Sequence, residues 1–363
     1  MRVRLSGIIG LGWSQALGID FGTANLRIAL PGGDVALNAP SLLVQRPDSP
    51  SILAWGEAAR GLIGDEPELG AWAEGATGTL LVRRPIRNGG VADLDASIAL
   101  LRQALAHLPP GHRLWRLLPV VASCSGTARD FEERALVAAL REAGVARLEL
   151  RPASRAAAVG AGVPLDDGRA NLVVDLGAGA TDIGVLWNGN LVVRHALRAG
   201  GEHLDACVVR LLRREYSLAV GPMTAESLKC RVGVGGFDET EGRVDVPGRD
   251  VRRGQFVSRS VPVTALQSAL AAPLAEIGAA VQAALEATPA GLNQDLMERG
   301  LVLVGGGARL RGLTAWLAGL TGLPVTVAEA PETCVVRGLV SSLRPETQRQ
   351  PAWRLATGTG AFP

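Results

Sequence analysis

The chain has 363 residues, a hydrophobic content of 47% and a net charge of +2, so it can bury a large core and is long enough for two or more domains. The near-neutral charge and the lack of a basic block give no reason to expect a nucleic acid partner. The four histidines have no metal-ligand spacing, and the cysteines are far apart, which indicates reduced core thiols in a cytosolic protein; they are Cys124, Cys207, Cys230 and Cys334.

Residues 1–16 form a leader with a basic start and a short apolar run. Its large apolar side chains are Leu5, Ile8, Ile9, Leu11 and Trp13. The run is too short to cross a bilayer, which takes about 20 apolar residues. We therefore predict a superficial membrane contact, and the alternative is a leader with no membrane role.

The stretch 17–30, LGIDFGTANLRIAL, has the pattern of a strand, a tight turn and a second strand. Glycine in such a turn lets backbone N–H groups approach a phosphate, and Thr23 adds a hydroxyl donor. A carboxylate at this place suits a hydrated Mg²⁺ better than a bare phosphate, which it would repel. The candidate binding residues are Asp20, Gly22, Thr23, Ala24 and Asn25.

The segments that follow predict the rest of a first α/β domain at 17–150, with a small subdomain inserted at 31–65. Short strands are expected at 35–37, 41–44 and 51–55, then a helix capped by Asp95, a core strand at 117–122 and an amphipathic helix at 127–142 with Phe131 facing inward. Leu114 and Trp115 lie between two arginines at the mouth of the core strand. They are a second candidate membrane contact, and the alternative is that Trp115 packs on its own domain.

The pattern of the first turn returns at 172–186, LVVDLGAGATDIGVL, and a third apolar strand at 301–304 runs into three glycines. Two acidic glycine turns and a later triple-glycine loop are far more specific together than any one of them. They predict one phosphate site with Mg²⁺ held by Asp20 and Asp175 through water. The candidates in this half are Asp175, Gly177, Ala178, Gly179, Gly200, Gly201, Gly305, Gly306, Gly307 and Ala308.

A second domain is predicted at 151–315, with a small subdomain at about 190–255. Thr224 is expected to cap a helix that places Glu226 and Lys229 on one face. The long apolar helix at 264–287 is interrupted by polar residues and a proline, so we predict that it is not transmembrane. Residues 316–345 are expected to return to the first domain, and 346–363 to form a flexible tail.

Lys229 is the only lysine among the 37 basic residues of the chain. One interpretation is that a single lysine is present by chance in a sequence that otherwise uses arginine. The alternative, which we favour, is a site that needs a compact ammonium in place of a planar guanidinium.

Several segments together resemble the MreB family of bacterial actin-like proteins, over residues 17–340. They are GIDFGTANLRIAL at 18–30, ALNAPSLLV at 36–44, RRPIRNGGVADLD at 83–95, AAAVGAGVPL at 156–165, VVDLGAGATDIGV at 173–185, TAESLK at 224–229, GLVLVGGGARLRGL at 300–313 and ETCVVRG at 332–338. Parts of this pattern are not shared with sugar kinases or DnaK-type chaperones.

The resemblance implies an actin-like ATPase fold, in which two duplicated α/β domains with four subdomains surround a nucleotide cleft. It implies that ATP and Mg²⁺ bind the two hairpins, that the triple-glycine loop lies under the adenosine, and that Glu226 and Lys229 border adenine and ribose. It also implies paired filaments on the inner face of the cytoplasmic membrane, where they guide cell-wall synthesis and rod shape with membrane-bound elongation proteins.

Two departures from the family pattern affect hydrolysis. Where the family has two glutamates and a proline before the alanine-rich helix, this chain has Pro152, Ala153 and Ser154. Where the second hairpin of the family has a glycine and then two threonines, Ala178 and Ala180 break the pattern and leave only Thr181 as a candidate catalytic residue. We therefore predict slow ATP hydrolysis.

Three other functions remain open from the sequence. One is a paralogue in the same family that polymerises with little or no hydrolysis. Another is a sugar-kinase-type phosphotransferase, which needs an aspartate base that the sequence does not present. A chaperone is the third, but nothing after the triple-glycine loop predicts a peptide-binding domain.

Overall fold

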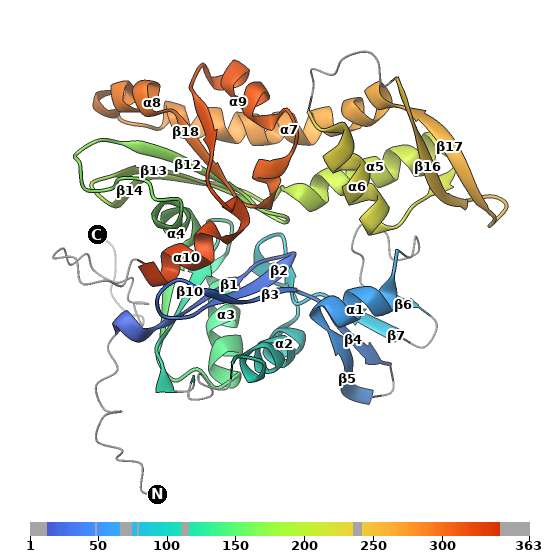
Figure 1. The fold of residues 1–363 in the computed structure, drawn as a ribbon, viewed down its shortest axis with the longest axis horizontal. Helices are drawn as coiled ribbons and strands as arrows, with labels where there is room; N and C mark the ends of the chain where they lie inside the picture. Colours follow the sequence, from blue (N-terminus) through green and yellow to red (C-terminus); the bar gives the residue numbers. More distant parts are fainter. Residues whose placement is uncertain are drawn as a thin grey trace, which may run out of the picture.

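Two five-stranded sheets of the same topology organise the computed structural model, which describes residues 13–47, 49–65, 75–77, 80–109, 115, 117–234 and 242–341 (Figure 1). The first has the order β3-β2-β1-β10-β11, with β1 (Leu17–Phe21), β2 (Asn25–Ala29), β3 (Val35–Pro40), β10 (Val120–Cys124) and β11 (Leu148–Pro152). The second has the order β14-β13-β12-β18-β19, with β12 (Asn171–Leu176), β13 (Thr181–Trp187), β14 (Asn190–Leu197), β18 (Leu301–Val304) and β19 (Val325–Val327). In each sheet an antiparallel meander of three strands is joined to two parallel strands, so the two halves are duplicates of one plan.

Apolar helices cover the sheets because their buried faces repeat at helical spacing. The helices α2 (Leu94–Ala106) and α3 (Asp130–Glu142) pack on the first sheet through a core that includes Leu100 and Leu140. The second core gathers residues from α5 (Gly201–Tyr216), α6 (Pro222–Val232), α7 (Val263–Glu286), α8 (Asn293–Arg299) and α9 (Leu313–Thr321). Short 3-10 turns lie at Trp13–Gln15, Ala290–Leu292, Gly306–Arg309 and Pro331–Thr333.

Two helices join the halves, α4 (Ala153–Gly160) and α10 (Cys334–Ser341), which lie side by side between the sheets in Figure 1. They touch through glycines. A Cβ at Gly160 would lie 1.8 Å from the Cys334 carbonyl oxygen, and a Cβ at Gly338 would lie 1.8 Å from that of Ala156. Only glycine permits such close backbone contact, and a side chain at either position would push the two halves apart.

A smaller sheet extends each half. The first has the order β5-β4-β7-β6, from β4 (Leu43–Arg46), β5 (Ser49–Trp55), β6 (Gly75–Thr77) and β7 (Leu80–Arg83), with α1 (Gly56–Ile63) on it. The second joins β15 (Leu218–Ala219), β16 (Arg243–Asp250) and β17 (Phe256–Pro262). A two-stranded ribbon, β8 (Ile86–Arg87) with β9 (Gly90–Val91), follows the first small sheet.

The limits of the small subdomains differ from the predicted ones. The strand β3, predicted inside the insertion at 31–65, pairs with β2 in the first main sheet, and the small sheet continues to Arg83. Likewise β14 belongs to the second main sheet, not to the small one. Of the segment predicted to return to the first domain, β19 stays in the second sheet and α10 packs on β1 and β10. The predicted tail at 346–363 lies outside the described residues.

Two predicted helix details were wrong. The cap of α2 is Asp93, not Asp95, because the Asp93 carboxylate accepts a hydrogen bond from the Ala96 N–H at 3.0 Å. Phe131 does not face inward: its side chain is 54% exposed in the first turn of α3, beside the Arg129 guanidinium.

The helix α7 is long and apolar enough to cross a membrane by length and composition. In the structure it packs against α5, β13 and β14, and its buried residues, such as Leu266 and Val281, belong to the core of the second half. This packing in the core agrees with the prediction that the helix is not transmembrane.

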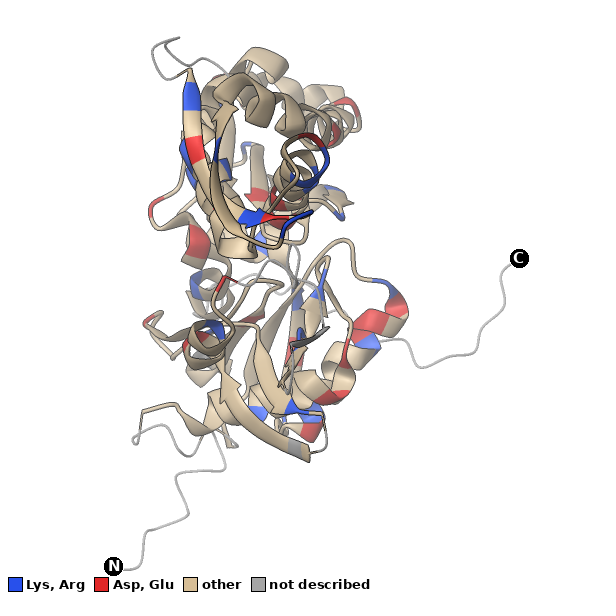
Figure 2. Ribbon diagram, turned by 90° about the vertical axis from the view of Figure 1, so that its right-hand side faces the viewer, with Lys and Arg blue, Asp and Glu red and all other residues tan. Residues whose placement is uncertain are grey.

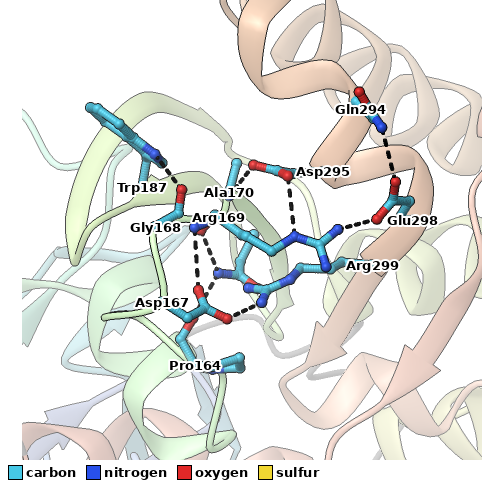
Figure 3. Close-up of polar contacts among 11 residues, drawn as sticks. Pro164, Asp167, Gly168, Arg169, Ala170, Trp187, Gln294, Asp295, Glu298 and Arg299 are labelled. Carbon is cyan, nitrogen blue, oxygen red and sulfur yellow. Dashed lines mark hydrogen bonds and ion pairs between the residues drawn. The ribbon is translucent and has the colours of Figure 1, made fainter.

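Charged residues of both signs are mixed over both halves (Figure 2). A network of ion pairs ties the loop before β12 to α8 (Figure 3). Arg169 contacts Asp295 at 3.2 Å and also Glu298, while the second oxygen of Asp295 accepts from the Ala170 N–H at 2.8 Å. Arg299 adds contacts to Asp167 and to Asn171. Because every charge here has a partner in the cluster, we interpret the network as a clamp within the second half.

Candidate functional site

The two hairpins and the triple-glycine loop line one pocket of about 270 Å³ between the halves. Fifteen of the predicted binding residues line it: Asp20, Gly22, Thr23, Ala24, Asn25, Asp175, Gly177, Ala178, Gly179, Gly201, Glu226, Lys229, Gly305, Gly306 and Gly307. Gly200 and Ala308 do not line it. Gly200 supports the second hairpin, because a Cβ there would lie 2.4 Å from the Gly177 carbonyl oxygen.

The two turns have the same internal geometry. The Gly22 N–H donates to the Asn25 carbonyl at 3.0 Å, and the Gly177 N–H donates to the Ala180 carbonyl at 2.9 Å. The turns also meet each other, because a Cβ at Gly179 would lie 2.4 Å from the Thr23 hydroxyl oxygen. Glycine is therefore required where the second hairpin faces the first, and the backbone of both turns is open to a bound anion.

The triple-glycine loop is held against the second hairpin. Gly305 has a φ of +82°, and a Cβ there would meet the Asp175 carboxylate at 2.4 Å. The positive φ favours glycine, and any side chain at this position would clash with Asp175. The loop thus forms the floor beside Asp175.

Three carboxylates, Asp20, Asp175 and Asp182, line the pocket. Asp20 accepts a hydrogen bond from the Ser123 hydroxyl at 2.7 Å, and Asp182 accepts one from the Ser125 hydroxyl at 2.8 Å. Burial raises the pKa of Asp175 and of Asp182 above the ordinary value, and the charge of Asp20 raises both further. This excess of negative charge fits a bound cation.

The residues present fit Mg²⁺ together with phosphates better than a cation alone. Within the described part of the chain, no three His, Cys, Asp or Glu side chains are arranged to hold a metal ion by themselves. Mg²⁺ in proteins commonly takes one or two carboxylates, several waters and the phosphates of a nucleotide. Asp20 and Asp175 would hold it, and the ion would offset phosphate charge next to them.

Lys229 is buried in the pocket wall and its partner is Asp205, not Glu226. The Lys229 ammonium lies 2.9 Å from an Asp205 carboxylate oxygen and donates to the Gly201 carbonyl at 3.3 Å. Burial raises the pKa of Asp205 to about 6, while the charge of Lys229 opposes that rise. Sequence reasoning missed Asp205, because its place one turn into α5 shows nothing of its partner on α6.

We predict that Lys229→Arg weakens ATP binding about tenfold, although it keeps the charge. The ammonium fits between Asp205 and the Gly201 backbone, and a longer planar guanidinium would displace one of them into the pocket. Calorimetric titration with ATP measures the change. Arg231→Lys, an exposed exchange on the same helix, is the matched control. Equal ATP affinities for the original protein and both variants would mean that a lysine at position 229 has no special role in binding.

Thr181 is misplaced for catalysis. Its side chain is fully buried, its hydroxyl donates to the Ala199 carbonyl at 2.7 Å, and it does not line the pocket. Its neighbours Ala180 and Asp182 line the pocket, as does Ala153 at the start of α4. At the two positions where the family resemblance implies hydrolysis residues, the pocket is therefore lined by alanine side chains.

Sequence reasoning also missed an arginine that crosses the cleft. Arg84 is 4% exposed, forms an ion pair with Glu202 in the first turn of α5, and donates to the Thr23 carbonyl at 3.4 Å. The signal was present, because Arg84 lies in the segment RRPIRNGG that carries the family resemblance.

Only two of the predicted membrane residues, Trp13 and Trp115, lie within the part of the chain that the structure describes. Leu5, Ile8, Ile9, Leu11 and Leu114 lie outside the described residues. Trp115 is 7% exposed and belongs to the core of the first half, so in this conformation its ring is not available to a bilayer. Trp13 is half-buried and packs against the apolar cluster between the two halves, with the Arg147 guanidinium 5.3 Å from its ring centre.

The fold and the pocket together define an actin-like protein with two halves around a central cleft, as comparison with solved structures confirms. MreB5 of Spiroplasma citri bound to AMPPNP superposes with a TM-score of 0.79 at 27% identity, over 89% of this chain and 93% of that one. The MamK double helical filament matches with a TM-score of 0.72 at 18% identity, over 91% of this chain and 98% of that one, which shows the shared fold.

Sequence comparison identifies the family. The family model described as MreB/Mbl protein matches residues 14–350. The cell shape-determining protein MreB of Escherichia coli (strain K12) is 34% identical over 331 residues, which cover 90% of this chain and 92% of that protein. The cell shape-determining protein Mbl of Bacillus subtilis (strain 168) is 32% identical over 326 residues, covering 90% and 95%. The chain belongs to the MreB/Mbl family.

Proposed function

We propose that this protein binds Mg-ATP in the cleft and assembles with copies of itself into cytoskeletal filaments that help to determine cell shape. The observation that carries the proposal is the meeting of Asp20, Asp175 and the two glycine turns in one pocket. Relatives support it: MreB5 was solved with AMPPNP and with ADP, MamK was solved as a filament, and the curated relatives are cell shape-determining proteins.

We also propose where in the cell the filaments lie. The filaments, with paired protofilaments, would lie in the cytoplasm on the inner face of the membrane and meet membrane-bound proteins of cell-wall elongation. This part rests on family membership and on the apolar run in the leader. Since Trp115 is buried, the leader carries the membrane contact in this proposal.

A second candidate is a filament former of the same family with little or no hydrolysis. The observation that favours it is that Ala153 and Ala180 line the pocket where the family resemblance calls for a glutamate and a threonine. Both candidates share ATP binding and assembly, and they differ only in turnover.

Electron microscopy of the purified protein with Mg-ATP and anionic lipid vesicles tests the proposal. We expect filaments that depend on nucleotide and that lie on the vesicle surface. Particles without filaments over a range of protein and nucleotide concentrations would contradict assembly.

We predict that deleting residues 1–13 releases the protein from vesicles in a flotation assay. One short apolar run binds weakly, but a filament presents many copies, so the loss on deletion should exceed tenfold for filaments. Deleting 346–363 from the other end is the matched control and should leave binding unchanged. Full retention after deletion of 1–13 would exclude the leader as the anchor.

A further inference from the structure

The helix α6 has no cap of its own and takes one from the other half of the molecule. Its N-cap is Gly221, which has no side chain, so the N–H groups of the first turn lack a local acceptor. The Asp65 carboxylate accepts from the Met223 N–H at 2.8 Å and from the Thr224 N–H at 3.2 Å. The Thr224 hydroxyl also donates to Asp65. Thr224, which we predicted to cap this helix, is therefore a partner of the capping residue.

This contact joins two helices that each line the nucleotide pocket. Asp65 lies two residues after the end of α1, which belongs to the small sheet of the first half, whereas α6 belongs to the second half (Figure 1). Both helices border the pocket, α1 through Arg60 and α6 through Glu226 and Lys229. A carboxylate at the positive end of a helix is a favourable charge arrangement. The contact thus joins the two walls on either side of the bound nucleotide.

Gly221 shows how close the two walls are. A Cβ at this position would lie 2.1 Å from an Asp65 carboxylate oxygen and 2.4 Å from the Asp65 carbonyl oxygen. The backbone of Gly221 is extended, with φ −78° and ψ 170°, which alanine adopts without strain. Glycine is needed at this place for the approach of Asp65 and not for the local conformation.

We propose that Asp65 is a positioning residue that holds the cleft closed over the nucleotide by capping α6 across the pocket. The inference rests on the proposed binding of ATP in this cleft. While Asp65 caps α6, it fixes the helix that carries Glu226 and Lys229 relative to α1. Nucleotide then leaves only after this contact has opened, so the contact sets the dissociation rate.

The test compares Asp65→Ala, Gly221→Ala and the double variant by stopped-flow release of a fluorescent ATP analogue. Loss of a charged cap should speed release about 5- to 20-fold. Gly221→Ala should have the same effect as Asp65→Ala, because it blocks the same contact sterically. The double variant should be no faster than either single one. Asp65→Asn keeps an acceptor and should retain part of the slow release.

Two controls separate this effect from general damage. Asp34→Ala removes an exposed carboxylate of the first half, and Gly61→Ala adds a methyl group on α1, where no atom beyond the adjoining residues and backbone of the helix itself lies within 4 Å of the new Cβ. Both should release nucleotide as the original protein does. Release rates that are equal in the original and in both contact variants would overturn the proposal.

A second measurement needs no nucleotide. Hydrogen exchange of the Met223 and Thr224 amides should be slow in the original protein and at least tenfold faster in Asp65→Ala, because Asp65 is the acceptor of both amides among the residues that the structure describes. If the original protein fails to bind ATP, the proposed function fails, but protected amides would still support the contact. Unprotected amides in the original protein would overturn the contact whatever the nucleotide result.

Discussion

Replacing Asp175 with asparagine is expected to weaken Mg-ATP binding about 10- to 100-fold, the usual loss when a group that holds a metal through water is changed. Asp175 lies in the floor of the pocket next to Gly305, where a cation between the phosphates and the hairpin would reach it. Calorimetry in Mg²⁺ and in EDTA measures both states. The original protein should lose affinity when Mg²⁺ is removed, whereas the variant should show little dependence on Mg²⁺.

The same exchange should not destabilise the protein without ligand. Burial and the charges of Asp182 and Asp20 raise the pKa of Asp175, so its ionised form opposes folding at neutral pH. Asparagine removes that charge and keeps the shape, and we expect a melting temperature at or above that of the original. Asp34→Asn, at an exposed turn, is the control for both measurements. Equal Mg²⁺ dependence in the variant and the original would contradict the site.

The phosphate hairpins were predictable because their chemistry is local. Asp20, Gly22 and Thr23 are neighbours in sequence, and a strand–turn–strand pattern fixes how they are presented. The repeat of this pattern around Asp175 then predicted a shared pocket. The structure brings these residues together as expected.

Residues whose role depends on a distant partner were not predictable. Asp205 and Arg84 are defined by contacts to Lys229 and Glu202, which come from other elements. A sequence pattern shows that such a residue is polar but not which group it faces. The Asp65 cap of α6 is of the same kind.

Thr181 shows a different failure. Successive side chains in a strand point to opposite faces. Because Ala180 and Asp182 line the pocket, the residue between them must face away, and its hydroxyl binds the Ala199 carbonyl. Thr181 was a candidate because its hydroxyl group could take part in hydrolysis, but its position in the strand turns that group away from the pocket.

Purified filaments are expected to hydrolyse ATP about 10²- to 10⁴-fold more slowly than a relative with the glutamate and the threonine that the family resemblance implies, which is the range for losing a group that orients or deprotonates water. Hydrolysis depends on a water held in line with the γ-phosphate, so catalysis is mostly positioning and electrostatics. Ala153 and Ala180 line the pocket but offer no donor or acceptor side-chain group.

Other carboxylates do not readily replace the missing groups. Glu149 forms an ion pair with Arg151 at 2.8 Å and does not line the pocket. Asp182 does line it, but its two oxygens already accept from the Ser125 hydroxyl and the Gly126 N–H. Asp182 is therefore held in place by the first half and is not free to orient a water as the missing glutamate would.

Restoring both groups in the variant Ala153→Glu with Ala180→Thr should raise phosphate release at least 100-fold, with ATP affinity within about threefold of the original. Ala153 is the first residue of α4, where a glutamate suits the helix dipole. Release of inorganic phosphate from filaments, measured beside ATP affinity, gives both numbers.

The single exchange Ala153→Glu should recover part of the hydrolysis rate, since a base without the second group positions the water less well. Turnover in the original protein equal to that of an intact relative would show that another residue supplies the water, and Asp182→Asn would then have to abolish it.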